Sequence, residues 1–116
     1  MIIGTGIDII EIDRIRQAIE RWGDHFLNHV FLENEIEYAR KHKSPVQHYA
    51  VRFAAKEAVF KAVGTNPNLT WKDIQIINDE HGRPQAVLKD PNFKNKIYLS
   101  LSHSKHYAVA SAIITP

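Results

Sequence analysis

The stretch RFAAKEAVFKA, residues 52–62, decides the fold, because its alanine-rich composition predicts a well-packed helix. With about 100° between successive residues, one buried stripe is expected on this helix, made of Val51, Ala55, Ala58 and Ala62. Glu57 and Lys61 lie four residues apart at one border of that stripe. Taken alone, they are typical of a surface ion pair worth about 0.5 kcal/mol or less. The alternative is a carboxylate that binds a hard metal ion, with a cation one turn away for a phosphate.

The remaining sequence predicts an α+β fold, with helices early in the chain and antiparallel strands later. Apolar residues at three- and four-residue spacing predict a helix over residues 12–26, with Gly23 inside it or near its end. Further helices are expected over 33–41 and 47–63, and Gly64 is a natural C-terminal cap for the second of these. The expected strands are 2–10, 73–77, 85–89, 97–101 and 107–115.

Length and composition limit the class of protein. A chain of 116 residues is expected to form a single domain, residues 1–116, that buries about two-thirds of its unfolded surface. The absence of cysteine excludes disulfides, zinc–thiolate sites and thiol nucleophiles. The N-terminus lacks the features of a signal peptide, and no apolar run approaches the ~20 residues of a membrane span, so a cytoplasmic protein is expected. The net charge of +2 is too small to indicate nucleic acid.

Asp8 interrupts the hydrophobic run of the first expected strand. Burial of an unpaired carboxylate is costly, so Asp8 is expected to be paired, metal-bound or at the strand end. Structural roles, such as capping the next helix or pairing with an arginine, remain open. If Asp8 and Glu57 meet, they supply the minimal protein contribution to a Mg²⁺ site, since this ion prefers hard oxygen ligands and completes its shell with water and substrate phosphates.

Three other segments have more than one interpretation. The turn from Ser100 to His106 combines hydroxyls, imidazoles and an ammonium, which suits ordinary turn chemistry or the binding of phosphate oxygens. The strand YAVASAIIT at 107–115 is rich in small residues, which predicts either a subunit interface or coverage by large residues of a helix. A strip beside the apolar side of the first helix suits an acidic helix of a partner, or is simply solvated; it consists of Arg14, Ala18, Arg21 and His25.

Three segments together resemble the signature blocks of the holo-[acyl-carrier-protein] synthase family, the small bacterial type of 4′-phosphopantetheinyl transferase. They are GIDIIEIDRI at 6–15, RFAAKEAVFKA at 52–62 and LSHSKHYAVA at 101–110. The blocks have the family's order in a chain of the family's length, and FLENEIEYA at 31–39 is also similar. One departure is the run Gly64-Thr65-Asn66, where the family commonly has Gly-Thr-Gly.

The resemblance implies transfer of phosphopantetheine from coenzyme A to a serine of apo acyl carrier protein, with release of adenosine 3′,5′-bisphosphate. It also implies Mg²⁺ and a homotrimer with active sites between subunits. In that scheme Asp8 and Glu57 bind the metal and Lys61 contacts the diphosphate. The residues implied for coenzyme A are Arg52, Lys61, Gly64, Ser102 and His103, with Arg52 and His103 chiefly at the 3′-phosphate. The strip of Arg14, Ala18, Arg21 and His25 receives the acidic helix of the carrier protein.

Two other functions remain open. A Mg²⁺-dependent hydrolase of a nucleotide diphosphate would use the same Asp8, Glu57 and Lys61 with water as attacker, and would turn over without a protein acceptor. A non-catalytic module would use the arginine strip to bind an acidic protein or RNA. RNA is disfavoured because the basic residues are not interleaved with exposed aromatic residues for base stacking; Trp22 and Phe26 are expected on the apolar stripe of the helix. A module without chemistry would also leave Asp8 unexplained.

Overall fold

The computed structural model of the protein describes residues 1–64 and 68–116 and has the predicted α+β architecture. Strands β1, β5 and β4 form one antiparallel sheet in that order, and β2 pairs with β3 in an antiparallel hairpin. A 3₁₀ turn over Trp71–Asp73 precedes the hairpin. In chain order the other elements are β1 (Gly4–Glu11), α1 (Ile12–Trp22), α2 (Asp24–Val30), α3 (Glu33–Arg40), α4 (Pro45–Val63), β2 (Ile74–Asn78), β3 (Pro84–Leu88), β4 (Lys96–His103) and β5 (Tyr107–Thr115).

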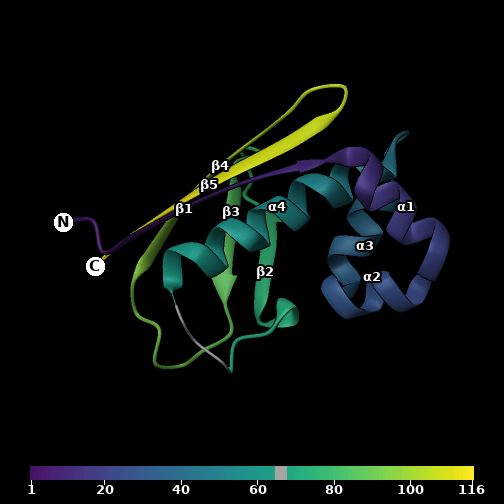
Figure 1. Ribbon diagram of the computed structural model, residues 1–116. Helices are drawn as coiled ribbons and strands as arrows, with labels where there is room; N and C mark the ends of the chain where they lie inside the picture. The colour runs from purple at the N-terminus through teal and green to yellow at the C-terminus, as the bar shows by residue number, and fades with distance from the viewer. Residues whose placement is uncertain (65–67) are drawn as a thin grey trace.

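Helix α4 is the central element of the molecule (Figure 1). It lies against one face of the three-stranded sheet, chiefly along β1 and β5. Helices α1, α2 and α3 gather at the N-terminal end of α4, and the β2–β3 hairpin packs beside its C-terminal half. The two chain ends lie together at the far end of the sheet, where the Ile3 amide donates a 2.8 Å hydrogen bond to the Ile114 carbonyl.

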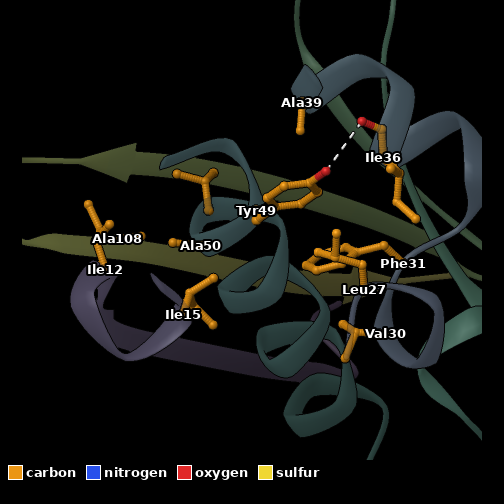
Figure 2. Close-up of a cluster of buried hydrophobic side chains, with 11 residues drawn as sticks. Ile12, Ile15, Leu27, Val30, Phe31, Ile36, Ala39, Tyr49, Ala50 and Ala108 are labelled. Carbon is orange, nitrogen blue, oxygen red and sulfur yellow. Dashed lines mark hydrogen bonds between the residues drawn. The ribbon is translucent and has the colours of Figure 1, made fainter. Parts of the chain in front are cut away.

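Helix α4 is buried on nearly all sides, not only along the predicted stripe. Pro45 is its first residue, a position where a backbone N–H would have no acceptor within the helix. The helix ends at Val63 and is capped by Gly64, which has φ = 86°. The core around its N-terminal half includes Phe31 and Tyr49, whose ring centroids lie 5.1 Å apart (Figure 2). The four residues of the predicted stripe are all buried, but so are Ala50, Ala54 and Val59. A helix covered this completely is held rigidly, and it fixes the positions of the side chains that project from it.

Close packing of β1 on α4 depends on the two glycines of the strand. A Cβ atom on Gly6 would lie 2.0 Å from the Ala58 carbonyl oxygen, and one on Gly4 would lie 2.1 Å from that of Ala62. Alternation along the strand places Asp8 on the same face as these glycines. The small residues of β5 serve the same purpose, because their buried members face α4; these are Ala108, Ala110 and Ala112. The helix-covered interpretation of the last strand is therefore correct for its alanines.

The helix predicted from residue 12 does not continue to residue 26; of the two positions expected for Gly23, the one near the end of the helix is correct. Gly23 has φ = 54°, a left-handed value that ends α1, and α2 begins at Asp24. The predicted packing of Trp22 on the apolar side is wrong, because its side chain is 52% exposed at the end of α1. Phe26 does pack against the core, as expected.

Candidate active site

Asp8 meets α4 through Lys61, which reaches back from the last turn of the helix. Lys61 Nζ lies 3.2 Å from Asp8 Oδ1 and donates a 2.9 Å hydrogen bond to the Ile7 carbonyl. The Asp8 side chain is 16% exposed and that of Lys61 is 53% exposed, so the pair sits at the edge of the packed layer. The expectation that Asp8 is paired is confirmed, with a lysine as its partner.

Glu57 lies in the electrostatic field of the same pair. Burial raises the pKa of the Glu57 carboxyl above its usual range, the negative charge of Asp8 raises it further, and Lys61 opposes both. Asp8 is therefore near enough to Glu57 for its charge to act on that carboxyl. In the part of the chain that the structure describes, no group of three or more acidic or histidine side chains is arranged for a metal. Asp8 and Glu57 are carboxylates, and carboxylate oxygens are the hard donors that Mg²⁺ prefers.

Of the two interpretations of Glu57 and Lys61, the surface ion pair between them is not found among the described residues. Among the ion pairs of residues 1–64 and 68–116, Lys61 has Asp8 as its partner and not Glu57. The reason is geometric: the glycines bring β1 so close to α4 that the lysine reaches the strand backbone as well as the Asp8 carboxylate. Glu57 keeps its carboxylate free of an ion pair within the described residues.

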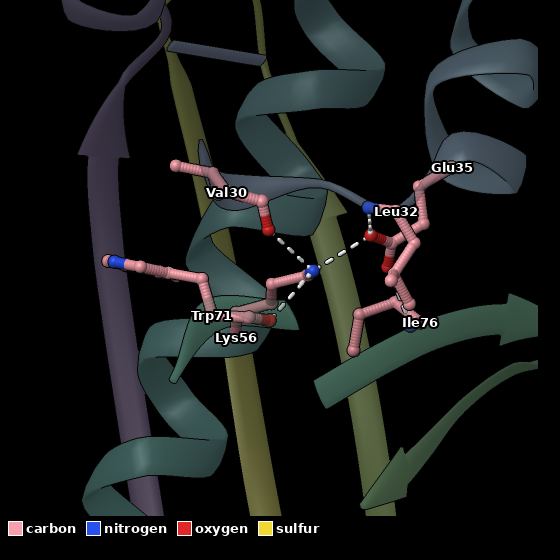
Figure 3. A network of polar contacts seen from close by, with 6 residues as sticks. All are labelled: Val30, Leu32, Glu35, Lys56, Trp71 and Ile76. Atoms are coloured by element: carbon pink, nitrogen blue, oxygen red, sulfur yellow. Dashed lines mark hydrogen bonds and ion pairs between the residues drawn. The ribbon is translucent and has the colours of Figure 1, made fainter. Parts of the chain in front are cut away.

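A buried polar network anchors the helix one residue before Glu57 (Figure 3). Lys56 Nζ donates hydrogen bonds to Glu35 Oε1 (2.7 Å), the Val30 carbonyl (2.8 Å) and the Trp71 carbonyl (3.1 Å). The two Glu35 oxygens in turn accept from the Leu32 and Ile76 amides, each at 2.8 Å. Burial lowers the pKa of the Lys56 ammonium, with Glu35 opposing that shift.

The sequence analysis missed this network, although a signal for it exists. Lys56 lies among Ala54, Ala55 and Ala58, which point in different directions around the helix axis. Apolar residues on several sides of a helix indicate that the helix is buried all round. A lysine inside such a helix needs a buried acceptor. The partner, Glu35, is 21 positions away in α3, and no local spacing connects the two residues.

Arg52 is a buried cation on the same helix, one turn before Lys56. Only 4% of the residue is exposed, and within residues 1–64 and 68–116 its Nε has no hydrogen-bond partner. Its guanidinium carbon lies 4.0 Å from the centroid of the Tyr38 ring, a cation–π contact. Burial lowers the pKa of the Arg52 guanidinium, while Tyr38 and, more weakly, the Glu35 carboxylate raise it. Arg52 therefore has donor capacity for an anion that the described residues do not supply.

Of the two residues of β4 that were expected to contact coenzyme A, the structure places His103, but not Ser102, on the side of the sheet where Arg52 lies. His103 pairs in register with the buried Ala108 of β5, so it lies on the face of the sheet that α4 covers. Ser102 pairs with Val109 and lies on the opposite face. Gly64 ends α4, where its amide bonds to the Phe60 carbonyl at 3.1 Å. The following Thr65 and Asn66, where the sequence departs from the family pattern, lie outside the described residues.

The predicted partner-binding strip is shorter than expected. Arg14 and Arg21 are exposed on α1 with the partly buried Ala18 between them, and Asp13 pairs with Arg16 rather than with either of these arginines. Arg21 lies over the Trp22 ring, 4.9 Å from its centroid. His25 is exposed but belongs to α2, beyond the break at Gly23. Its predicted position one turn after Arg21 on a continuous helix is therefore wrong.

Residues 4–112 match the model of the 4′-phosphopantetheinyl transferase superfamily. This chain belongs to that superfamily. The holo-[acyl-carrier-protein] synthase of Thermodesulfovibrio yellowstonii is 47% identical over 115 residues, which cover 99% of this chain and 100% of the relative. The predicted family resemblance is thereby confirmed.

Solved structures of the superfamily share the fold. The holo-(acyl-carrier-protein) synthase of Bacillus anthracis, in complex with CoA (3′,5′-ADP), has a TM-score of 0.86 at 39% identity, covering 98% of this chain and 96% of that one. The Helicobacter pylori holo-[acyl-carrier-protein] synthase in complex with coenzyme A has a TM-score of 0.84 at 32% identity, covering 96% and 99%. In the described part of the chain, no helix is both long and apolar enough to cross a membrane.

Proposed function

We propose that this superfamily member transfers 4′-phosphopantetheine from coenzyme A to a serine of apo acyl carrier protein and releases adenosine 3′,5′-bisphosphate. The observation that carries the proposal is the grouping of Asp8, Glu57 and Lys61 where β1 meets α4. Two carboxylates and one ammonium at a partly exposed edge suit a diphosphate substrate. The near full-length similarity to holo-[acyl-carrier-protein] synthases supports this substrate class.

In this reaction the serine oxygen of the carrier forms a bond to the phosphorus that bears pantetheine. The bond from that phosphorus to the bridging oxygen breaks, and the electron pair leaves with adenosine 3′,5′-bisphosphate. Lys61 stabilises the charge that develops on the leaving phosphate, because its ammonium is held beside the site by Asp8 and the Ile7 carbonyl. The serine proton passes to Glu57 or to a water beside it; burial and the charge of Asp8 raise the pKa of Glu57, which makes its carboxylate a better proton acceptor than an ordinary glutamate.

Mg²⁺ fits this donor set. Asp8 and Glu57 would hold the ion, since burial and, after it, the negative charge of Asp8 raise the pKa of Glu57, and a divalent cation would relieve the repulsion between the two carboxylates. When bound, the ion would neutralise phosphate charge as a Lewis acid. Mg²⁺ keeps several waters and needs only one or two carboxylates when a substrate phosphate completes its shell. The pair in this chain meets that requirement without a third acidic residue.

The open face of the three-stranded sheet supports a homotrimer. On the side away from α4, strand alternation exposes large apolar residues; these are Ile7, Ile9, Tyr98, Tyr107 and Ile113, all more than a third exposed. Ile7 and Ile9 are each 65% exposed on the edge strand β1. An apolar sheet face of this kind is typical of a surface that another subunit covers. Light scattering measures the oligomeric state, and a monomer with full transfer activity would contradict the trimer.

The deciding experiment incubates the protein with coenzyme A, Mg²⁺ and apo acyl carrier protein and then measures the mass of the carrier. We expect an added phosphopantetheine on the carrier serine and an equal amount of adenosine 3′,5′-bisphosphate. A parallel reaction without carrier tests the alternative hydrolase. Release of the bisphosphate at the same rate without carrier, or an unmodified carrier, would overturn the proposal. The cytoplasmic location remains a prediction.

A further inference from the structure

A second group of titratable side chains lies around Arg52 and away from the Asp8–Glu57 pair. The rings of His42 and His48 stack with their centroids 3.8 Å apart, and that of Tyr38 lies 4.6 Å from His42 and 5.7 Å from His48. His42 Nδ1 is 2.8 Å from the Tyr38 carbonyl oxygen, which fixes that nitrogen as an N–H donor. Both histidines are partly buried, so the stack has a defined geometry and an open side.

The groups that act electrostatically on His48 are positively charged or become so when they are protonated. They come from His42 after α3, Arg52 on α4 and His103 on β4, and together with burial they lower the pKa of the His48 imidazole. The other groups nearby are Tyr38, whose hydroxyl accepts from Asn78 Nδ2 at 2.9 Å, and the buried Glu35, which is paired with Lys56. No acidic side chain is among the charges that act on His48. Protonation of the stack therefore has no compensating anion within the described residues.

Arg52 shows independently that an anion is missing. Only 4% of Arg52 is exposed, and a buried arginine normally has its donors satisfied, yet its Nε has no hydrogen-bond partner among the described residues and its guanidinium carbon lies over the Tyr38 ring. Arg52 precedes Glu57 by five residues, about 7.5 Å along the helix axis. An anion beside Arg52 is therefore distinct from a diphosphate beside Lys61. In coenzyme A, the group that is both separate from the diphosphate and able to carry two charges is the 3′-phosphate.

We propose that His42 and His48 complete a phosphomonoester site with Arg52 and His103, and that the imidazole stack takes up a proton when the 3′-phosphate of coenzyme A binds. The proposal rests on the proposed function and adds two residues and a pH dependence to it. The bound phosphate supplies the missing negative charge and raises the proton affinity of the stack. Binding therefore becomes tighter as the pH falls through the range in which the free stack is neutral and the bound stack is charged.

Calorimetry with adenosine 3′,5′-bisphosphate tests this directly, at pH values from about 6 to about 8 and in buffers of different ionisation enthalpy. For uptake of one proton the affinity changes by about tenfold per pH unit at most. We expect the wild type to take up roughly half to one proton, and His48→Asn to take up much less and to have a flatter pH profile. The second ionisation of the ligand phosphate, near pH 6, is common to both proteins and cancels in the comparison. Exposed His29 provides the matched control, and His29→Asn should behave as wild type.

Adenosine 5′-monophosphate provides the ligand control, because it lacks the 3′-phosphate. The difference between wild type and His48→Asn should be lost with this ligand. If His48→Asn does not fold, as judged by circular dichroism, His42→Asn gives the same comparison. Equal proton uptake by wild type and variant, or a difference that persists with the monophosphate, would overturn the inference and leave phosphopantetheine transfer intact. If the wild type binds the bisphosphate at no pH, the inference and the proposed function both fail.

Discussion

Lys56 Nζ lies 2.7 Å from Glu35 Oε1, and neither side chain is exposed to solvent. Through this pair α4 is connected to α3, and through the other Glu35 oxygen to the Ile76 amide of β2. Lys56 also donates hydrogen bonds to the carbonyl of Val30, the last residue of α2, and to that of Trp71, the first residue of the 3₁₀ turn. Since Lys56 adjoins Glu57 in sequence, the network fixes the part of α4 from which the candidate metal ligand projects.

Replacement of Lys56 by methionine should be strongly destabilising. The change removes the ammonium and leaves the Glu35 carboxylate buried without its ion-pair partner, which typically costs about 3–5 kcal/mol. Denaturation in urea measures the loss in the free energy of unfolding. Lys43→Met is the matched control, because Lys43 is exposed and its replacement should change stability by less than about 0.5 kcal/mol. Equal stability of the two variants would mean that the buried pair does not hold the elements together.

Gly6→Ala should damage both the fold and the site. The added methyl would lie 2.0 Å from the Ala58 carbonyl oxygen, which is backbone and cannot rotate away, so β1 must move from α4. Overpacking of this kind costs about 1–3 kcal/mol or more. The same movement separates Asp8 from Lys61, so transfer should fall further than stability alone explains. Thr5→Ala, on the exposed face of the same strand, is the control. Full transfer activity in a folded Gly6→Ala protein would show that the close approach does not position Asp8.

Glu57→Gln should abolish transfer without unfolding the protein. The neutral amide removes a metal donor, and loss of a charge-stabilising group commonly costs about a hundredfold or more in rate. It also removes the repulsion with Asp8, so the melting temperature without metal should be unchanged or higher. Mg²⁺ at tenfold excess over its dissociation constant should add about 1.4 kcal/mol to the wild type, roughly 5 °C in Tm, and nothing to the variant. An active Glu57→Gln enzyme, or an equal Mg²⁺ shift in both proteins, would remove Glu57 from the proposed metal site.

The element types were predictable from periodicity and turn chemistry, because most segments obey local rules. The last strand, 107–115, has the predicted bounds, and Gly64 ends α4 as expected. The break at Gly23 was harder to predict, since apolar spacing continues through it from Ile19 to Phe26. Only the left-handed φ of the glycine interrupts the helix, and a 3.6-residue pattern does not report that angle.

The site was predictable where residues share an element and not where the fold joins distant ones. The cost of a lone carboxylate predicted that Asp8 would be paired, metal-bound or at the strand end, and the structure pairs it with Lys61, a partner that was not predicted. The switch of Lys61 from Glu57 to Asp8 depends on how closely β1 approaches α4, which is a tertiary property. The stack of His42 on His48 likewise requires the particular path of the chain between α3 and α4.

The arginines of α1 should govern the affinity for the carrier protein rather than the chemistry. Arg14 and Arg21 are exposed on α1, so Arg14→Glu or Arg21→Glu places a negative charge against an acidic partner helix. We expect the KM for apo acyl carrier protein to rise about tenfold or more, with the dissociation constant of adenosine 3′,5′-bisphosphate unchanged. Added salt should weaken carrier binding by the wild type and have less effect on the variants, because screening acts on the attraction that the variants lack. Arg16→Glu is the matched control, since Arg16 is exposed on the same helix but is held by Asp13 at 2.9 Å. An equal rise in KM for all three variants would mean that net charge alone, and not the Arg14–Arg21 strip, receives the carrier.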